Sequence, residues 1–272
     1  MPQEQYHTAM RIVIKNHILN ISISGSSESE SAIIFLPGWG RTLGDFDELR
    51  QAMQQRVPAY RFVQIDLPGF GGSPLPLDKK GLEISDYVAM LENLLEKMEI
   101  ERAVFVGHSF GGKVAVAFAA AHPERAEKLV LIASAGASRI SARARLIKIG
   151  AFGFRLLMRG FRDGSPVARR LKYHLRRFFG SSDYVSAASP GLRETLKECL
   201  AYDIKPLAIK MRVPVLLLWG RDDTVTPLSD TEVWRAWIPS ARLAVLDDCG
   251  HFPFLKYPER CVELIGLFLQ NV

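Results

Sequence analysis

The stretch VFVGHSFGGKVA, residues 104–115, places Ser109 between glycines, directly after an apolar run. A Gly-x-Ser-x-Gly pattern can present a nucleophilic serine where a strand precedes it and a helix follows, because the chain must turn sharply there. Both conditions are met, since AVFVG is typical of a strand and GGKVAVAFAAAH of a helix. Gly107 and Gly111 are expected where a side chain would collide across the turn. Ser109 is therefore predicted to be a nucleophile; the alternative is a serine that caps the helix.

A serine hydroxyl is a poor nucleophile unless a base takes its proton and a third group holds that base. Of the six histidines, His251 in LDDCGHFPFL directly follows the last predicted strand. Loops after the carboxyl ends of parallel strands gather at one edge of the sheet, so His251 can reach Ser109. His108 is expected to point elsewhere on the turn. The alternative is that His251 is a loop histidine satisfied by the backbone.

The third group is expected to be a carboxylate after the preceding strand. The segment LLLWGRDDTVTP offers Asp222 and Asp223 at this place. Asp223 is the first choice and Asp222 the second, whereas Asp247 and Asp248 stand too close to His251 in the sequence. Acids are common in surface loops, so order and location along the chain are what favour this pair.

Acyl transfer also needs hydrogen-bond donors for the negative charge that develops on the carbonyl oxygen. The backbone N–H of Phe110 follows the nucleophile at the start of its helix. The loop FLPGWGRT, residues 35–42, supplies a second candidate, the N–H of Trp39. Gly38 and Gly40 would let this backbone approach a substrate; the alternative is an ordinary tight turn.

The elements that must hold these residues alternate along the chain. Apolar runs predict strands at 10–16, 17–25, 31–36, 61–65, 103–107, 128–133, 213–219 and 242–246. Amphipathic stretches predict helices at 45–56, 84–98, 112–122, 228–238 and 259–269. This alternation indicates an α/β fold: a mostly parallel sheet of about eight strands with helices on both faces. The first two runs are expected to form an antiparallel hairpin on its edge.

One segment interrupts the alternation. Residues 137–207 have helical periodicity and no strand candidate, and they lie between the sixth strand and the seventh. The predicted organisation is therefore an α/β core of residues 1–136 and 208–272, with a helical cap, or lid, at 137–207.

The predicted cap is strongly basic. Between Arg139 and Ser182 twelve cationic residues face a single acid, Asp163, so this stretch carries +11, whereas the whole chain carries +6 and the remainder −5. The expected role is a solvated cap whose apolar side covers the active site. Two alternatives are docking of an anionic carrier protein or coenzyme A, and adhesion to an anionic membrane surface. Nucleic-acid binding is not expected, because core-like apolar residues interleave with the cations.

Composition limits the class of protein and the cellular compartment that this sequence fits. With 48% apolar and 24% charged residues the chain can bury a sizeable core, and no apolar run approaches the length of a membrane span. The three cysteines, Cys199, Cys249 and Cys261, have neither disulfide-framework nor zinc-site spacing. A cytoplasmic protein is expected. The oligomeric state is open.

Taken together, these motifs resemble the α/β-hydrolase superfamily. The resemblance rests on the elbow GHSFGG, the loops LPGWG, DLPGFGGS and WGRDDTVTP, and the histidine loop GHFPFL, all in the family's order. It covers residues 9–136 and 208–272 and leaves the cap unmatched. The family's Gly-x-x-Asp spacing supports Asp223 over Asp222. Relatives that dehalogenate or open epoxides use an aspartate nucleophile, so Ser109 speaks against both activities.

The resemblance implies a serine esterase that hydrolyses a small or acyl-chain carboxylic ester through an acyl-enzyme, without a metal or organic cofactor. The loops PGWG and DLPGFGGS look like the branch that includes pimeloyl-carrier methyl ester esterases. Carbon–carbon hydrolases of ring-cleavage products share the Ser-His-Asp triad and stay an alternative, as does a non-catalytic ligand-binding protein on this fold. Phe152, Phe154 and Phe252 are candidates for an apolar substrate pocket, although core packing explains any one of them equally well.

Overall fold

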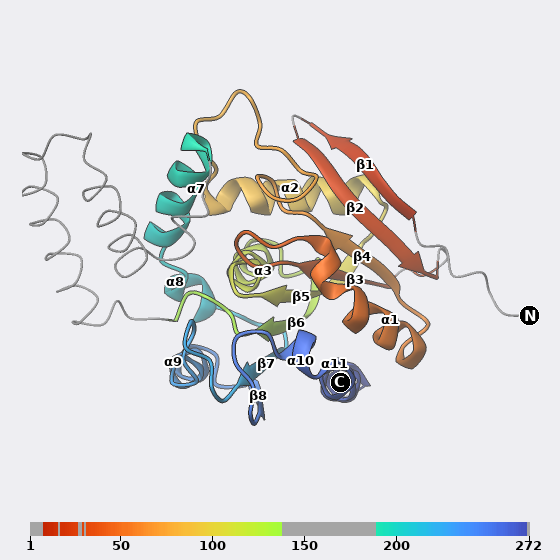
Figure 1. Cartoon of the computed structure of the whole chain (residues 1–272), viewed down its shortest axis with the longest axis vertical. Helices are drawn as coiled ribbons and strands as arrows, with labels where there is room; N and C mark the ends of the chain where they lie inside the picture. Colours follow the sequence, from red (N-terminus) through yellow and green to blue (C-terminus); the bar gives the residue numbers. More distant parts are fainter. Residues whose placement is uncertain (1–7, 16, 27–28, 30, 138–188, 271–272) are drawn as a thin grey trace, which may run out of the picture.

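The computed structural model describes residues 8–15, 17–26, 29, 31–137 and 189–270. Eight strands in this part of the chain form one sheet, in the order β1-β2-β4-β3-β5-β6-β7-β8 (Figure 1). Their bounds are Thr8–Ile14 (β1), His17–Gly25 (β2), Ser31–Leu36 (β3), Arg61–Ile65 (β4), Arg102–His108 (β5), Ala126–Ile132 (β6), Val215–Gly220 (β7) and Arg242–Leu246 (β8).

The strand pairing confirms the predicted sheet. β1 and β2 form an antiparallel hairpin at one edge, and β2 also pairs antiparallel with β4. The remaining pairs are parallel. Central strands such as β7 are buried along their whole length, which is why they read as continuous apolar runs without alternation.

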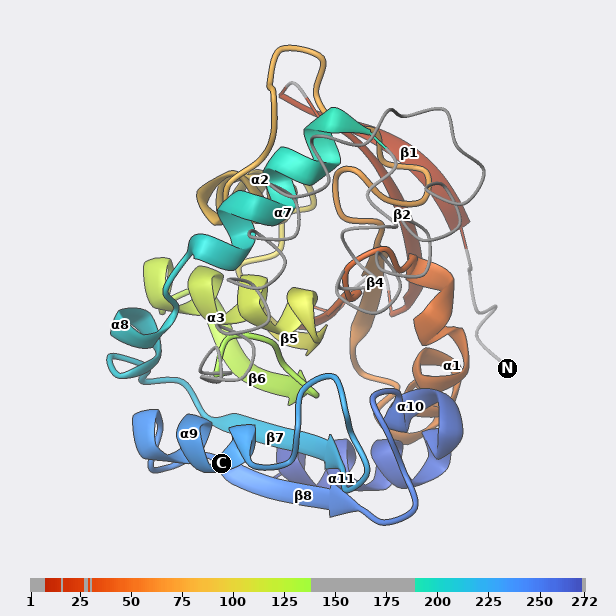
Figure 2. The same cartoon turned by 60° about the vertical axis from the view of Figure 1, so that its left-hand side comes forward.

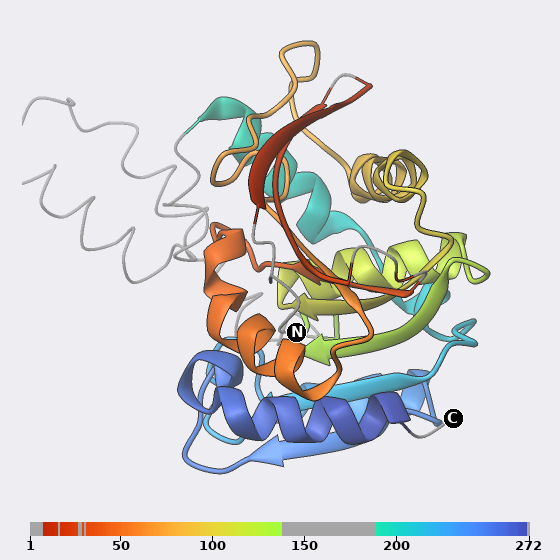
Figure 3. The ribbon, with the colours of Figure 1, turned by 90° about the vertical axis from the view of Figure 1, so that its right-hand side faces the viewer.

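Helices cover both faces of this sheet (Figure 3). On one face α1 packs against α11 and α10, and on the other α3 packs against α2 and α8, with α9 next to α8. The bounds are Leu43–Phe46 for the 3-10 helix η1, then Asp47–Arg56 (α1), Ile84–Lys97 (α2), Phe110–Ala121 (α3), Pro190–Ala201 (α7), Lys205–Ala208 (α8), Asp230–Trp237 (α9), Pro253–Lys256 (α10) and Pro258–Gln270 (α11). The short helix α10, inside the predicted histidine loop, was not anticipated, because four residues are too few to show a helical period.

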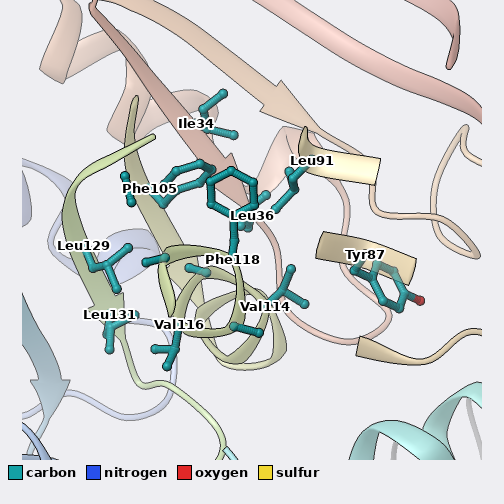
Figure 4. Packing of buried hydrophobic residues seen from close by; sticks show 14 of the residues in the cluster. Ile34, Leu36, Tyr87, Leu91, Phe105, Val114, Val116, Phe118, Leu129 and Leu131 are labelled. Carbon is teal, nitrogen blue, oxygen red and sulfur yellow. The ribbon is translucent and has the colours of Figure 1, made fainter. Parts of the chain in front are cut away.

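A hydrophobic core lies between the sheet and helices α2 and α3, which cover one of its faces (Figure 4). Phe105 of β5 and Phe118 of α3 are both fully buried, with ring centroids 4.8 Å apart. Leu91 of α2 and Leu131 of β6 belong to the same buried cluster. Each such side chain contributes about 1.5–3 kcal/mol by leaving water. This packing fixes the start of α3 relative to the ends of the strands.

The chain between β6 and β7 contains α7 and α8 in its described part, and α7 is attached to the core by polar contacts. Lys113 of α3 donates through Nζ to the carbonyl oxygens of Cys199 (2.6 Å) and Tyr202 (2.7 Å), at the carboxyl end of α7. The Leu82 amide donates to Thr195 Oγ1 over 2.9 Å. Most of the predicted cap lies outside the described residues, so the division into core and cap stays a prediction.

Gly111, in the first turn of α3, lies against the end of β3. A Cβ atom placed on it would stand 2.0 Å from the carbonyl oxygen of Leu36, and one placed on Gly107 would stand 2.6 Å from Cα of Gly112. The sequence predicts that a side chain at either position would collide across the turn; this is so for Gly107, whereas Gly111 meets the neighbouring strand. In both cases the obstacle is backbone, which cannot rotate away.

Gly111→Ala is therefore expected to lower the free energy of unfolding by roughly 3 kcal/mol or more, because backbone must shift to admit the methyl group. Urea denaturation followed by circular dichroism measures the change. Gly44→Ala is the matched control, since its nearest neighbour is a flexible Asp47 oxygen at 3.6 Å. Equal stability of the two variants would contradict this account of the turn.

Candidate active site

Three loops meet at the carboxyl edge of the parallel strands. Ser109 directly follows β5, Asp223 follows β7 and His251 follows β8. The last two loops lie side by side (Figure 2), and the Asp222 amide donates to the Cys249 carbonyl oxygen over 2.8 Å. The sheet topology thus places Ser109 at the same edge of the sheet as Asp223 and His251, which lie more than a hundred positions further along the chain.

Ser109 occupies a strained turn between β5 and α3. Its backbone has φ 48° and ψ −110°, in the positive-φ region that non-glycine residues seldom occupy. Backbone hydrogen bonds hold this conformation: the Ser109 amide donates to Ile132 (3.0 Å), and the Ser109 carbonyl accepts from Gly112 (3.1 Å) and Ala135 (3.0 Å). The side chain is partly exposed and makes no capping bond to α3, which contradicts the helix-cap alternative.

His251 and Asp223 form a close pair. Nδ1 of His251 lies 2.8 Å from Oδ2 of Asp223, whose side chain is fully buried. The other carboxylate oxygen, Oδ1, accepts the backbone amides of Val225 (2.8 Å) and Thr226 (2.9 Å). The Thr226 hydroxyl lies 2.8 Å from Oδ2 and 3.1 Å from the carbonyl oxygen of Ala133. The Asp223 carboxylate is therefore surrounded by donors on both oxygens.

These donors decide the charge of Asp223. Burial acts to raise the pKa of this carboxyl group, but the hydrogen bonds and charge of His251 and the hydrogen bonds from Thr226 outweigh it, so the pKa lies below its usual value. Asp223 is accordingly a carboxylate at neutral pH. Asp222, the second choice from the sequence, has an exposed side chain.

His108 lies in a position that sequence reasoning missed. Its ring, expected to point elsewhere, stands 4.7 Å from the His251 ring and 5.1 Å from that of Phe252, centroid to centroid. Nε2 of His108 lies 2.9 Å from the His251 carbonyl oxygen, and since a carbonyl only accepts, Nε2 carries the proton. Burial, followed by the charge of His251, lowers the pKa of His108 to about 3. This histidine is neutral and supports the loop that carries His251.

The two predicted oxyanion donors come from neighbouring elements. Phe110 is the first residue of α3, so its amide is one that the helix itself leaves without a partner. Trp39 lies in the loop after β3, and its ring meets that of Phe110 edge-on at 5.4 Å. Phe70 (4.9 Å from Trp39) and Tyr87 (5.2 Å from Phe110) complete an aromatic cluster beside the turn.

The predicted pocket residues divide into two groups. Phe252 lies beside the site, with its ring 5.1 Å from that of His251. Phe152 and Phe154 lie outside the described residues. Thr226 was not anticipated, although a threonine three positions after an aspartate is a usual partner in local side-chain turns.

The described residues also bear on metal binding, cysteine chemistry and membrane insertion. Within the described ranges, no group of three or more histidine, cysteine or acidic side chains could hold a metal ion. The three cysteines are buried and free. No helix in this part of the chain is long and apolar enough to cross a bilayer.

Residues 33–264 match the Alpha/beta hydrolase family. A 2-hydroxymuconate semialdehyde hydrolase of Pseudomonas putida is 32% identical over 78% of this chain and 77% of its own length. A pimeloyl-[acyl-carrier protein] methyl ester esterase of Nitrosomonas europaea is 28% identical over 85% of this chain and 92% of its own. Among solved structures, a membrane phospholipase A described as a bacterial virulence factor superposes with a TM-score of 0.75, at 24% identity over 98% of this chain and 87% of that one.

The family match spans most of the chain, and the strand order and solved structures agree with it. The relatives include both an esterase and a carbon–carbon bond hydrolase by name, so they define the fold and the general class of reaction. The chain belongs to the α/β-hydrolase family.

Proposed function

We propose that this protein is a serine hydrolase that cleaves a carboxylic ester through an acyl-enzyme, with Ser109 as nucleophile, His251 as base and Asp223 as the orienting acid. The observation that carries the proposal is the pair of partly exposed His251 and buried Asp223, 2.8 Å between Nδ1 and Oδ2, at the edge of the sheet where the strained Ser109 turn lies. A nucleophile, a base and a group that orients the base are the parts that this chemistry requires.

In the proposed reaction, Nε2 of His251 accepts the Ser109 hydroxyl proton as the serine oxygen attacks the ester carbonyl. The carbon–oxygen bond to the alcohol then breaks, and the alcohol leaves with the proton from His251. Water attacks the acyl-enzyme with His251 again as base, which releases the acid and restores Ser109. Asp223 stays a carboxylate throughout and stabilises the imidazolium.

The amides of Phe110 and Trp39 are proposed to bind the oxyanion of each tetrahedral intermediate. Two features support this assignment: Phe110 opens a helix, whose amino-terminal end favours negative charge, and the Trp39 and Phe110 rings are in contact. Removing one such donor typically costs about a hundredfold or more in rate. The aromatic cluster with Phe70 supports an apolar environment for the acyl group.

Carbon–carbon bond hydrolysis is the second candidate. It is supported by the 2-hydroxymuconate semialdehyde hydrolase of Pseudomonas putida, which is 32% identical over 78% of this chain, against 28% over 85% for the esterase named above. Both reactions would use the same three residues, so substrate turnover must distinguish them. A non-catalytic binding protein is disfavoured because all three side chains are present and two are already paired.

Three predictions depend on properties beyond this site. For the basic segment 139–182, the solvated cap stays the prediction and docking of an anionic carrier or membrane surface stays an alternative, since the segment lies outside the described ranges. The cytoplasmic location and the use of no cofactor likewise stay predictions.

Ser109→Ala is expected to abolish hydrolysis of p-nitrophenyl esters from acetate to palmitate, because no other group can form the acyl-enzyme. Turnover is read from p-nitrophenolate release, and the chain length that is cleaved best sizes the acyl pocket. Ser229→Ala, an exposed serine whose side chain does not cap α9, is the control.

Turnover of 2-hydroxymuconate semialdehyde, with all p-nitrophenyl esters refused, would replace the ester proposal with carbon–carbon hydrolysis. Full esterase activity in Ser109→Ala would contradict the role of Ser109 itself.

Thr226→Val is expected to lower kcat about tenfold with little change in KM, because Asp223 loses one hydrogen bond to its charged form. Thr226→Ser keeps the hydroxyl and should recover most of the activity. Thr231→Val is the matched control, since the hydroxyl of this buried threonine is likewise a hydrogen-bond donor, to the Leu228 carbonyl oxygen, but lies on α9. An unchanged kcat in Thr226→Val would show that the hydroxyl does not position Asp223.

A further inference from the structure

Arg41 is a cation at the candidate site that the proposed reaction does not use. It lies in the loop after β3, two residues beyond Trp39, and its side chain is 39% exposed. Nε of Arg41 is paired with Asp45, four residues along the chain. The guanidinium also lies over the ring of Phe252, with Cζ 5.1 Å from the ring centroid.

These contacts place Arg41 against the residue that follows the candidate base. Phe252 follows His251 directly, and their ring centroids are 5.1 Å apart. The Phe252 ring therefore contacts both the Arg41 guanidinium and the His251 imidazole. Burial and the charge of His251 are the first causes of the lowered pKa of His108, and the charge of Arg41 contributes in the same direction. The positive charge of Arg41 thus acts on His108, a residue of the site.

The contacts also restrict the guanidinium on two sides. A guanidinium carries five N–H donors in a planar fork, and stacking on an aromatic face removes part of its hydration. Asp45 occupies the Nε donor, and among the described residues the terminal nitrogens have no hydrogen-bond partner. The outer edge of the fork can therefore receive a second acceptor.

Charge balance indicates which acceptor fits. Arg41 is already paired with Asp45, so any bound anion adds negative charge, and a singly charged group adds less than a doubly charged one. A carboxylate carries one charge, and its two oxygens match the two terminal nitrogens.

We propose that Arg41 binds a carboxylate of the substrate, so that the preferred substrate is an ester whose acyl chain ends in a carboxylate. This inference rests on the proposed esterase function and specifies its substrate class. Arg41 is a specificity-determining residue in this role: it contributes binding energy to the charged substrate and takes no part in proton transfer.

The test compares two esters of equal chain length, mono-p-nitrophenyl adipate and p-nitrophenyl hexanoate, which differ at the far end by a carboxylate against a methyl group. The measured quantity is kcat/KM for the adipate ester divided by kcat/KM for the hexanoate ester. Arg41→Gln is expected to lower the ratio about tenfold, because a charge-assisted hydrogen bond at a partly exposed site is lost. Arg41→Glu should lower it further, and Arg41→Lys should keep part of the preference.

Arg260→Gln is the matched control, because Arg260 is also an exposed arginine in a local ion pair, with Glu263, but lies on α11. Its ratio should equal that of the unmodified enzyme. In the unmodified enzyme the preference should also weaken as NaCl is raised, since the guanidinium is partly exposed. This second measurement does not depend on the folding of any variant.

The outcomes separate the two proposals. Hexanoate turnover that Ser109→Ala abolishes, together with an unchanged ratio in Arg41→Gln, would overturn the carboxylate subsite and leave the esterase proposal standing. Failure of the unmodified enzyme to cleave either ester would overturn both. A lowered ratio in Arg41→Gln but not in Arg260→Gln supports the subsite.

Discussion

The close approach of helix α3 to the end of strand β3 is the constraint on which the site depends. Gly111 lies so near the Leu36 carbonyl that no side chain fits between them. The chain must therefore turn sharply after β5, and Ser109 takes a strained backbone conformation at the turn. The same contact places the start of α3 beside the loop that carries Trp39. One backbone contact thus positions the candidate nucleophile and both candidate oxyanion donors.

The candidate base and acid depend on a second close contact, between the loops after β7 and β8. A Cβ atom on Gly220 would stand 2.2 Å from the carbonyl oxygen of Gly250, so only glycine lets these loops meet. Their contact brings His251 to Asp223, whose charge is kept in a buried place by donors on both carboxylate oxygens. Neutral His108 fills the space behind His251. The site therefore holds a buried carboxylate, Asp223, that pairs with His251. The second histidine, His108, is neutral and hydrogen-bonds to the backbone of His251.

Much of this arrangement could be predicted from the sequence, because strand positions and the turn that follows a strand depend on local sequence patterns. The strands at 31–36, 61–65 and 242–246 were predicted with their observed bounds. The contact between His108 and His251, 143 positions apart, could not be predicted, since strand order places the two residues at one edge of the sheet but does not specify which side chains pack there. The stacking of Arg41 on Phe252 is long-range in the same way. The predicted pocket residues Phe152 and Phe154 belong to a segment whose role the sequence pattern suggests and the described structure does not test.

The central claim is that Ser109 is an activated nucleophile, and covalent labelling tests it most directly. The unmodified protein would be treated with a fluorophosphonate, digested, and examined by mass spectrometry for the modified peptide. The account predicts a single phosphonylated residue, Ser109, with labelling greatly slowed in His251→Asn because the base that activates the hydroxyl is missing. No labelling, or labelling at another residue with Ser109 unmodified, would contradict it.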